Sequence, residues 1–334
     1  MAVKIIAEVA QAHDGSIGRA HSFIDAVSDC GVDAIKFQTH IAQYESSDLE
    51  PWRVKFGYED ETRYDYWKRM EFPEEQWAGL IQHSRERGLE FIGTPFSVES
   101  LEMLCRLGVQ RWKLASGEIT NRFLVRQLAK LGQPVIMSSG MSNWEELDET
   151  VRCLQDGGVE LTLLQCTSAY PVPLEKVGLN VLKQMMERYQ IPVGLSDHSG
   201  DIFASLAAVA LGAQCIEVHF CLSPYDFGPD TVASLTVEQL KMLVQGIRQI
   251  EIMLEHPINK DAQAQELATM HTIFTKSLYA KEPIPAGTEI RWEMLGAKKP
   301  CAGIPVTDVE KVLGRHASRT IDADSFLHWE DVER

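Results

Sequence analysis

The chain lacks the features that mark secreted or membrane-spanning proteins. Its seven cysteines are odd in number and no pair is spaced as CxxC, so neither a disulfide framework nor a structural zinc site is predicted. Most of these cysteines lie in apolar runs, and we expect reduced, buried thiols in a cytoplasmic protein. No apolar run reaches the roughly 18 residues that span a bilayer, so we expect no membrane contact.

Positive charge is also scarce. The formal net charge is −16, which argues against nucleic acid as the main partner. The first eight residues become acidic too soon for a signal peptide, and we expect them to begin the first β-strand instead. Against this acidic background, lysines gathered at one place would indicate a site for an anion.

Short apolar runs alternate with helix-like stretches along most of the chain. The runs are continuously apolar, as expected of parallel strands that are buried on both faces. We predict eight strands, at 3–9, 34–38, 90–96, 111–116, 134–139, 161–167, 192–197 and 215–220. The predicted helices include 19–30, 73–87, 97–107, 121–131, 143–155, 179–189, 202–211 and 237–255. Eight strands alternating with helices predict an α/β fold, a (β/α)8 TIM barrel.

Two further segments stand apart from the repeating pattern. After residue 258 the chain becomes polar and then rich in short strand-like runs and tight turns, so we predict a barrel domain at 1–258, a linker at 259–276 and a small, mostly β domain at 277–334. A long aromatic-rich segment, 44–71, follows the second strand. It is either a surface lid with its own small core or part of a sugar or dimer contact.

Two histidines end neighbouring predicted strands, at the barrel edge where TIM-barrel enzymes place their chemistry. They are His198, after the strand at 192–197, and His219, near the end of the strand at 215–220. Either histidine alone is more often a hydrogen-bonded core residue than a ligand. Together, two neutral imidazoles directed at one point favour a divalent metal site that can act as a Lewis acid.

Two lysines, Lys36 and Lys113, lie inside otherwise apolar strands, where an unpaired charge is costly. One interpretation is ion pairing within the barrel, with Glu8 or Glu118. The other is a site for a phosphate or carboxylate, aided by hydroxyls at the same edge of the barrel. These hydroxyls belong to Ser116, Ser138, Ser139 and Ser196. Glu118 is also placed to move a proton.

The order of these motifs resembles the sialic acid (N-acetylneuraminate) synthase family, which includes legionaminic and pseudaminic acid synthases. The resemblance covers nearly the whole chain, and the segment from about residue 277 is similar to the antifreeze-like (SAF) domain of that family. The motifs that carry it lie at 5–8, 13–15, 36–38, 93–96, 113–118, 166–171, 194–198, 217–220 and 228–230.

The resemblance implies a condensation of phosphoenolpyruvate with an open-chain N-acetylated amino sugar, such as N-acetylmannosamine, to give a nine-carbon 2-keto sugar acid and phosphate. It implies Mn²⁺ or Mg²⁺ at His198 and His219. The implied catalytic residues are Glu118, Glu8 and Lys113. Phosphoenolpyruvate would be bound by Lys36, Lys113, Ser116, Ser138, Ser139 and Ser196, and the sugar by Gln38, Tyr170, Asp230 and Lys299.

The resemblance also implies a domain-swapped homodimer, in which the SAF domain of one chain covers the barrel of the other. Lys299 stands where the family usually has an arginine for the N-acetyl group of the sugar, and Asp14 stands where asparagine is usual. Lysine lacks the planar fork of arginine. The identity of the sugar therefore stays open.

Two other classes of function remain open from the sequence. A Schiff-base pyruvate aldolase would use Lys113 or Lys36 as its nucleophile and would not need both histidines. A non-catalytic carbohydrate-binding protein would use the small C-terminal domain and would show no turnover. Lysines, serines and histidines collected at one edge of an acidic protein favour the synthase over both.

Overall fold

The computed structural model describes residues 2–55 and 57–333 and divides the chain into two compact units, Met1–Glu255 and His256–Arg334. The predicted barrel domain, 1–258, therefore covers the first unit. The predicted linker, 259–276, falls in the second unit and forms two short helices, α11 (Lys260–Glu266) and α12 (Ala268–Phe274). Among the described residues, no helix is both long and apolar enough to cross a membrane.

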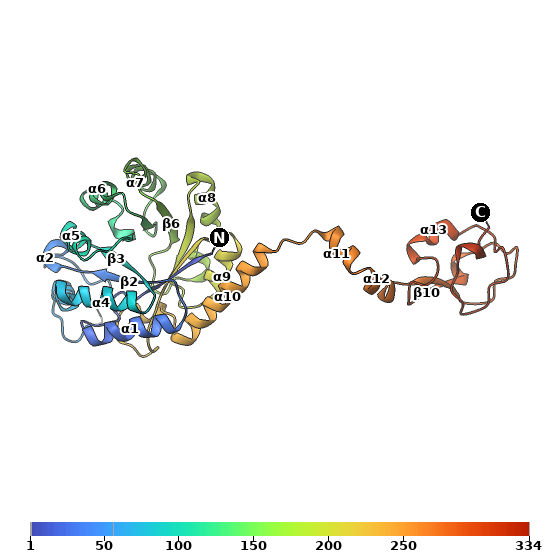
Figure 1. Cartoon of the computed structure of the whole chain (residues 1–334), viewed down its shortest axis with the longest axis horizontal. Helices are drawn as coiled ribbons and strands as arrows, with labels where there is room; N and C mark the ends of the chain where they lie inside the picture. Colours follow the sequence, from blue (N-terminus) through green and yellow to red (C-terminus); the bar gives the residue numbers. More distant parts are fainter. Residues whose placement is uncertain (1, 56, 334) are drawn as a thin grey trace. The chain divides into compact units, whose positions relative to one another are not determined.

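The predicted (β/α)8 barrel is confirmed: within the described residues, eight parallel strands close on one another in chain order. Helices surround them (Figure 1). The strands are β1 (Lys4–Glu8), β2 (Ala34–Thr39), β3 (Glu90–Pro95), β4 (Trp112–Leu114), β5 (Val135–Ser138), β6 (Leu161–Cys166), β7 (Val193–Asp197) and β8 (Cys215–His219). The main helices are α1 (Ile17–Asp29), α4 (Glu74–Glu86), α5 (Val98–Arg106), α6 (Arg122–Leu131), α7 (Trp144–Asp156), α8 (Leu179–Tyr189), α9 (Phe203–Ala210) and α10 (Val237–Glu255).

Local sequence signals begin and end these helices. Ser97 caps α5 and Asn143 caps α7, each accepting a hydrogen bond from a backbone N–H in the first turn of its helix. Gly132 ends α6 in the left-handed conformation, at a φ of 62°, which glycine adopts without steric cost. Such caps fix where each helix stops and where the following strand begins.

Two apolar layers hold the barrel together. The outer layer packs the helices against the sheet and includes the fully buried Phe23, Trp77 and Trp112. The inner layer fills the barrel and consists of Ile6, Ala34, Ile92, Ile136, Leu164 and Cys215. Each inner residue precedes by two positions a residue of the candidate site on the same strand, so both point into the barrel. The inner layer therefore forms the apolar floor beneath that site.

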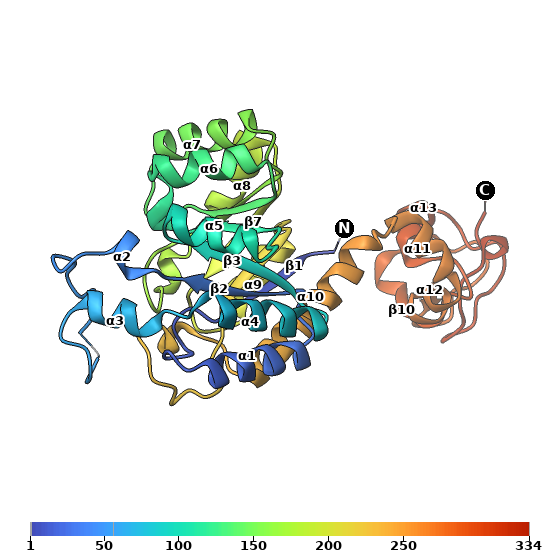
Figure 2. The ribbon, with the colours of Figure 1, turned by 60° about the vertical axis from the view of Figure 1, so that its left-hand side comes forward.

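The predicted aromatic-rich segment, 44–71, contains two short helices, α2 (Ala42–Glu45) at its start and α3 (Arg63–Met70). Figure 2 shows α2 and α3 projecting from one end of the barrel. Arg69 ties this segment together, because its guanidinium pairs with Asp60 at 2.8 Å and with Asp14 at 2.6 Å. The described part of this segment thus has its own helices and ion pairs and projects from the barrel after β2.

The second unit has its own small core, which includes Leu278, Ile290 and Leu327. Its one two-stranded sheet in the described residues pairs β9 (Ser277–Ala280) with β10 (Leu295–Lys298) in antiparallel register. Among the described residues, the other strand-like runs predicted in this domain form no continuous strands. They contribute isolated bridges, such as Ile284 with Ile321, because tight turns interrupt them.

Candidate active site

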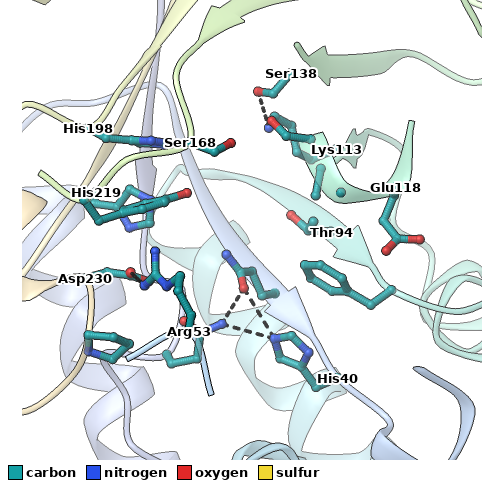
Figure 3. A pocket seen from close by; sticks show the side chains of 18 of the residues that line it. His40, Arg53, Thr94, Lys113, Glu118, Ser138, Ser168, His198, His219 and Asp230 are labelled. Carbon is teal, nitrogen blue, oxygen red and sulfur yellow. Dashed lines mark hydrogen bonds and ion pairs between the residues drawn. The ribbon is translucent and has the colours of Figure 1, made fainter. Parts of the chain in front are cut away.

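The carboxyl ends of the barrel strands enclose a cavity of about 440 Å³. Alternation along each strand brings the inward-facing side chains together there. The predicted site residues that line it are Lys36, Gln38, Lys113, Ser116, Glu118, Ser138, Tyr170, Ser196, His198, His219 and Asp230. Figure 3 shows His198 and His219 on one side of this cavity and Lys113 and Glu118 on the other.

A buried carboxylate, Glu217, lines the cavity and pairs with both lysines. Its Oε1 accepts a hydrogen bond from Ser196 Oγ at 2.9 Å and lies 3.3 Å from Lys113 Nζ. Its Oε2 lies 3.9 Å from Lys36 Nζ. Burial favours the neutral acid, but the two lysines, Lys113 foremost, hold the pKa of Glu217 well below its usual range. The carboxylate therefore stays ionised between two cations.

Each lysine also has polar partners other than Glu217. Lys36 is ion-paired with Glu8 and donates to Thr94 Oγ1 at 3.3 Å, while Lys113 donates to Ser138 Oγ at 2.7 Å. The predicted alternative of ion pairing within the barrel is thus correct for Lys36 and Glu8. The pairing with Glu118 that the sequence leaves open is not found among the described residues; Lys113 pairs with Glu217 instead.

The charges on the floor nearly cancel. Lys36 and Lys113 face the carboxylates of Glu8 and Glu217, and all four side chains are buried. Burial lowers the pKa of Lys36, because its charged form loses water, whereas Glu217 opposes that shift. An incoming phosphate would find hydrogen-bond donors at the floor, but it would need further positive charge to be neutralised.

His198 and His219 face each other edge to face, with their ring centroids 5.1 Å apart. His198 Nδ1 lies 3.1 Å from the carbonyl oxygen of Thr167, which can only accept, so Nδ1 carries the proton and Nε2 has the lone pair, with Ser196 Oγ 3.4 Å away. Burial lowers the pKa of both histidines to about 3, helped by His219 in one case and by Lys36 in the other. Both rings are therefore neutral near pH 7, as metal ligands must be.

The donor set at this pair fits a divalent metal that is held in part by substrate. Two neutral imidazoles suit first-row divalent ions. However, no group of three or more His, Cys, Asp or Glu side chains converges as a metal site within residues 2–55 and 57–333. A metal at His198 and His219 would thus keep several positions for water or substrate oxygen.

Glu118 lies at the other side of the cavity, in a short 3-10 turn, η1 (Ser116–Glu118). Its Oε2 accepts from Asn121 Nδ2 at 2.7 Å. Burial raises the pKa of Glu118 above its usual range, the Asn121 hydrogen bond opposes this, and nearby Glu45 adds to it. A carboxyl group with a raised pKa is well placed to exchange protons near neutral pH.

Ser116 connects this turn with the next strand end. Its Oγ accepts a hydrogen bond from the backbone N–H of Gly140 at 3.0 Å. A Cβ at Gly140 would lie 2.7 Å from Ser116 Oγ and 2.3 Å from Ser168 Oγ. The absence of a side chain at Gly140 therefore leaves room for both hydroxyls in this part of the site.

Tyr170 joins the histidine pair to the segment at 44–71. Its ring stacks on His198, with centroids 4.2 Å apart, and meets His219 edge to face at 5.5 Å. On the other face, the guanidinium of Arg53 lies 4.4 Å from the ring centroid and pairs with Asp230 at 2.7 Å. Figure 3 shows Arg53 beside Asp230. The segment thus contributes to the cavity wall.

Two predicted site residues of the barrel do not line the cavity, and a third belongs to the second unit. Ser139 lies between inward-facing positions, and its Oγ donates to Gln165 Oε1 at 3.3 Å, so alternation turns it away. Glu8 lies beneath the cavity, paired with Lys36. Lys299 belongs to the second unit, where it is exposed and lies 5.0 Å from the ring centroid of Phe274.

Several lining residues were missed by the sequence analysis. Glu217 had a signal: it lies two residues before His219 on one strand and therefore points the same way. Thr94 lies two residues after Ile92 on β3, and Ile92 points into the barrel, so Thr94 does too. Arg53 had no comparable signal, because it comes from an irregular segment.

A further group that the sequence analysis missed is His40 with Glu45. His40 is buried between the rings of Trp67 and Phe96, and its Nδ1 lies 2.6 Å from Glu45 Oε1. Both His40 and Glu45 line the cavity.

Comparison with known families gives two matches. The NeuB family matches residues 23–259, and the SAF domain matches residues 275–333. The first match covers more than half of the chain, so the chain belongs to the NeuB family and carries an SAF domain. The predicted resemblance to sialic acid synthases is therefore confirmed.

Individual relatives match over nearly their full length. The chain is 35% identical to the N,N'-diacetyllegionaminic acid synthase of Campylobacter jejuni subsp. jejuni, over 97% of this chain and 98% of that protein. It is 33% identical to the N-acetylneuraminate-9-phosphate synthase of Mus musculus, over 98% and 92%. A crystal structure of the N-acetylneuraminic acid (sialic acid) synthetase of Leptospira borgpetersenii serovar Hardjo-bovis, in complex with citrate, matches with a TM-score of 0.72 and 31% identity, covering 81% of this chain and 92% of that one.

Proposed function

From its place in the NeuB family, we propose that this chain condenses phosphoenolpyruvate with an open-chain N-acetylated amino sugar. The product is a nine-carbon 2-keto sugar acid of the sialic acid type, and phosphate is released. One observation carries the proposal: two buried lysines and a neutral histidine pair line one cavity at the carboxyl ends of the barrel strands.

The cavity floor is the proposed phosphoenolpyruvate site. Lys36 and Lys113 supply charge, and the hydroxyls of Ser116, Ser138 and Ser196 supply hydrogen-bond donors for the phosphate and carboxylate. Thr94, which already accepts from Lys36, joins this set. The near-neutral floor needs additional positive charge to hold so highly charged an anion, which supports a divalent ion beside it.

His198 and His219 are the proposed ligands of Mn²⁺ or Mg²⁺. An ion held there would supply Lewis-acid polarisation of the sugar aldehyde, so that its carbonyl carbon would become a better electrophile. Thr167 orients His198 through its Nδ1–H, and Tyr170 packs against both rings. These contacts hold the two lone pairs in place before any substrate binds.

The remaining residues act on the sugar and on protons. C3 of phosphoenolpyruvate bonds to the aldehyde carbon, whose oxygen takes up a proton from solvent. Water then adds at C2, and as the C2–O bond to phosphate breaks, the new C2 hydroxyl gives its proton to the departing phosphate and becomes the ketone oxygen. Glu118, with its raised pKa, accepts the proton that this water loses. Gln38, Tyr170 and Asp230 line the part of the cavity where the sugar would lie.

A phosphate-release assay tests this proposal. It combines phosphoenolpyruvate and Mn²⁺ with a panel of N-acylated hexosamines and identifies the product by mass spectrometry. We expect release only when both substrates are present, loss of release with a chelator, and recovery when Mn²⁺ or Mg²⁺ is restored. Release from phosphoenolpyruvate alone, or full activity with chelator, would contradict the proposal.

Phosphate release and borohydride trapping together separate the synthase from the two other classes of function. A Schiff-base aldolase would form a pyruvate adduct that borohydride traps on Lys36 or Lys113 and would not depend on metal. Both lysines already have a carboxylate partner, Glu8 for Lys36 and Glu217 for Lys113, and the proposed condensation uses neither lysine as a nucleophile. We therefore expect no trapped adduct. A carbohydrate-binding protein without catalysis would release no phosphate.

A further inference from the structure

One arginine on the cavity wall has no role in the reaction described above. Arg53 comes from the irregular segment at 44–71, and its side chain is 41% exposed. Its guanidinium forms the outer layer of a three-layer stack, over Tyr170 at 4.4 Å, which in turn stacks on His198 at 4.2 Å. The segment therefore reaches the proposed metal pair through one aromatic ring.

The position of this guanidinium is fixed from two sides. Asp230 accepts from Nη2 at 2.7 Å, and Tyr170 supports the flat face of the group. Asp230 is itself held in place, because its backbone carbonyl oxygen accepts from Ser234 Oγ at 2.8 Å and from the N–H of Ala233 at 2.9 Å. A guanidinium held in this way can present its other N–H groups to a ligand at little further entropic cost.

The charge of Arg53 is already balanced. Among the described residues, Asp230 is the one carboxylate within ion-pairing distance of it. The other arginine on the cavity wall, Arg63, is paired with Glu50 at 3.0 Å. Glu45 and Glu118 also line the cavity, so its outer part carries no uncompensated arginine charge and has an excess of carboxylates. That environment suits neutral oxygen atoms and repels a second phosphate.

We infer that Arg53 is a specificity-determining residue, which donates hydrogen bonds to a neutral oxygen of the acceptor sugar, a hydroxyl or the N-acyl carbonyl, and which together with Asp230 disfavours acceptors that carry a phosphate. This inference rests on the proposed function and deepens it. Relatives named for a free sugar acid and for a sugar acid 9-phosphate both match this chain, so the distinction decides which acceptor it takes.

Substitution of Arg53 tests the contact with the sugar. In the full-length protein we expect Arg53→Ala to raise the KM for the sugar by about tenfold to a hundredfold, as for loss of a charged hydrogen bond. The KM for phosphoenolpyruvate should stay within twofold. Arg53→Lys should recover only part of the loss, because lysine keeps the charge but not the fork.

A matched control lies on the outside of the barrel. Arg188 pairs with Asp148 and lies 5.9 Å from the ring centroid of Tyr189, so it repeats the arginine, aspartate and tyrosine arrangement away from the cavity. We expect Arg188→Ala to leave both KM values unchanged. The inference is overturned if Arg53→Ala leaves the KM for the sugar within twofold, or raises both KM values equally.

The charge argument is tested by binding, independently of turnover. Calorimetry on the full-length protein, with phosphoenolpyruvate and a chelator present so that no condensation takes place, compares N-acetylmannosamine with N-acetylmannosamine 6-phosphate. We expect the neutral sugar to bind more tightly, and Asp230→Asn, which frees the charge of Arg53, to narrow or reverse the ratio. Equal or tighter binding of the 6-phosphate by the wild type, or binding of neither sugar, overturns the inference whatever the phosphate-release assay gives.

Discussion

At the scale of single residues, the buried carboxylate of Glu217 organises the cavity floor. It is shared by Lys113, Lys36 and Ser196, three side chains from three different strands. A buried charge that loses its partner costs far more than an exposed one. The arrangement therefore ties the stability of the barrel to the geometry of the proposed phosphate site.

Neutralising the Glu217 carboxylate tests how much it contributes to the stability of the barrel. We expect Glu217→Gln to lower the free energy of unfolding by about 3 kcal/mol, because two buried lysines lose a shared counter-charge. The control is Glu90→Gln, since Glu90 also pairs with two cations, Lys4 and Arg111, but is about one-third exposed. Urea unfolding should show a loss below about 1 kcal/mol for that variant. Equal losses would contradict a special role for Glu217.

The raised pKa of Glu118 predicts an acid limb in the pH profile. A carboxyl group whose pKa is raised by burial takes up its proton at a higher pH than ordinary glutamate, so kcat/KM should fall as pH decreases through that raised value. Asn121→Ser keeps a capping oxygen for α6 but removes the N–H donated to Glu118. Since that hydrogen bond lowers the pKa, we expect the limb to move to higher pH. An unchanged limb would contradict the assignment.

At the scale of elements, the spacing of two residues along a strand explains most of the site. Ser196 and His198 share one side of β7 and its end, as Glu217 and His219 share one side of β8. The same rule turns Ser139 away from the cavity. Alternation therefore predicts which members of a strand end can meet, once the strand and its inward face are known.

Close approach of neighbouring strands depends on one glycine. A Cβ at Gly194 of β7 would lie 2.0 Å from the carbonyl oxygen of Cys215 on β8, so β7 must shift to accept it. We expect Gly194→Ala to lower the free energy of unfolding by about 3 kcal/mol.

Its control is Gly79→Ala, in helix α4, where a Cβ meets nothing within 4 Å. There we expect a gain of about 0.5–1 kcal/mol, from helix propensity and a less flexible unfolded chain. Urea unfolding followed by tryptophan fluorescence checks both variants. A harmless alanine at Gly194 would show that the two strands can separate at little cost.

The barrel was predictable from the sequence because its signals are local. Continuous apolar runs mark buried parallel strands, and capping residues such as Ser97 and Asn143 mark helix starts. The histidines and lysines of the site could be predicted because they lie at or near the ends of the predicted strands. Arg53 and the pairing of Lys113 with Glu217 could not, because they depend on a long irregular segment and on contacts between strands distant in the sequence.

At the scale of the whole molecule, the chain consists of two units with separate cores. The barrel closes on itself within the first unit, and its residues need no partner from the second unit to complete the apolar layers. This division predicts that stability and activity respond differently to truncation.

Removal of residues after 258 should leave a folded barrel. We expect circular dichroism of the truncated chain to retain the helix and sheet signals, and phosphoenolpyruvate to bind as before. Turnover should fall at least tenfold, since we propose that the SAF domain of a partner chain covers the cavity in a swapped dimer. Light scattering of the full-length chain measures that assembly. Full activity of the truncated barrel would contradict the covering role.

The apolar layer formed by Ile6, Ala34, Ile92, Ile136, Leu164 and Cys215 has a kinetic consequence. It fills the barrel below the lysines, so within the described residues a ligand reaches the cavity floor from the carboxyl ends of the strands. A ligand on the floor must enter before one that fills the opening above it, and must leave after it. Phosphoenolpyruvate should therefore bind first and phosphate depart last, and excess sugar should slow the reaction by occupying the opening too early.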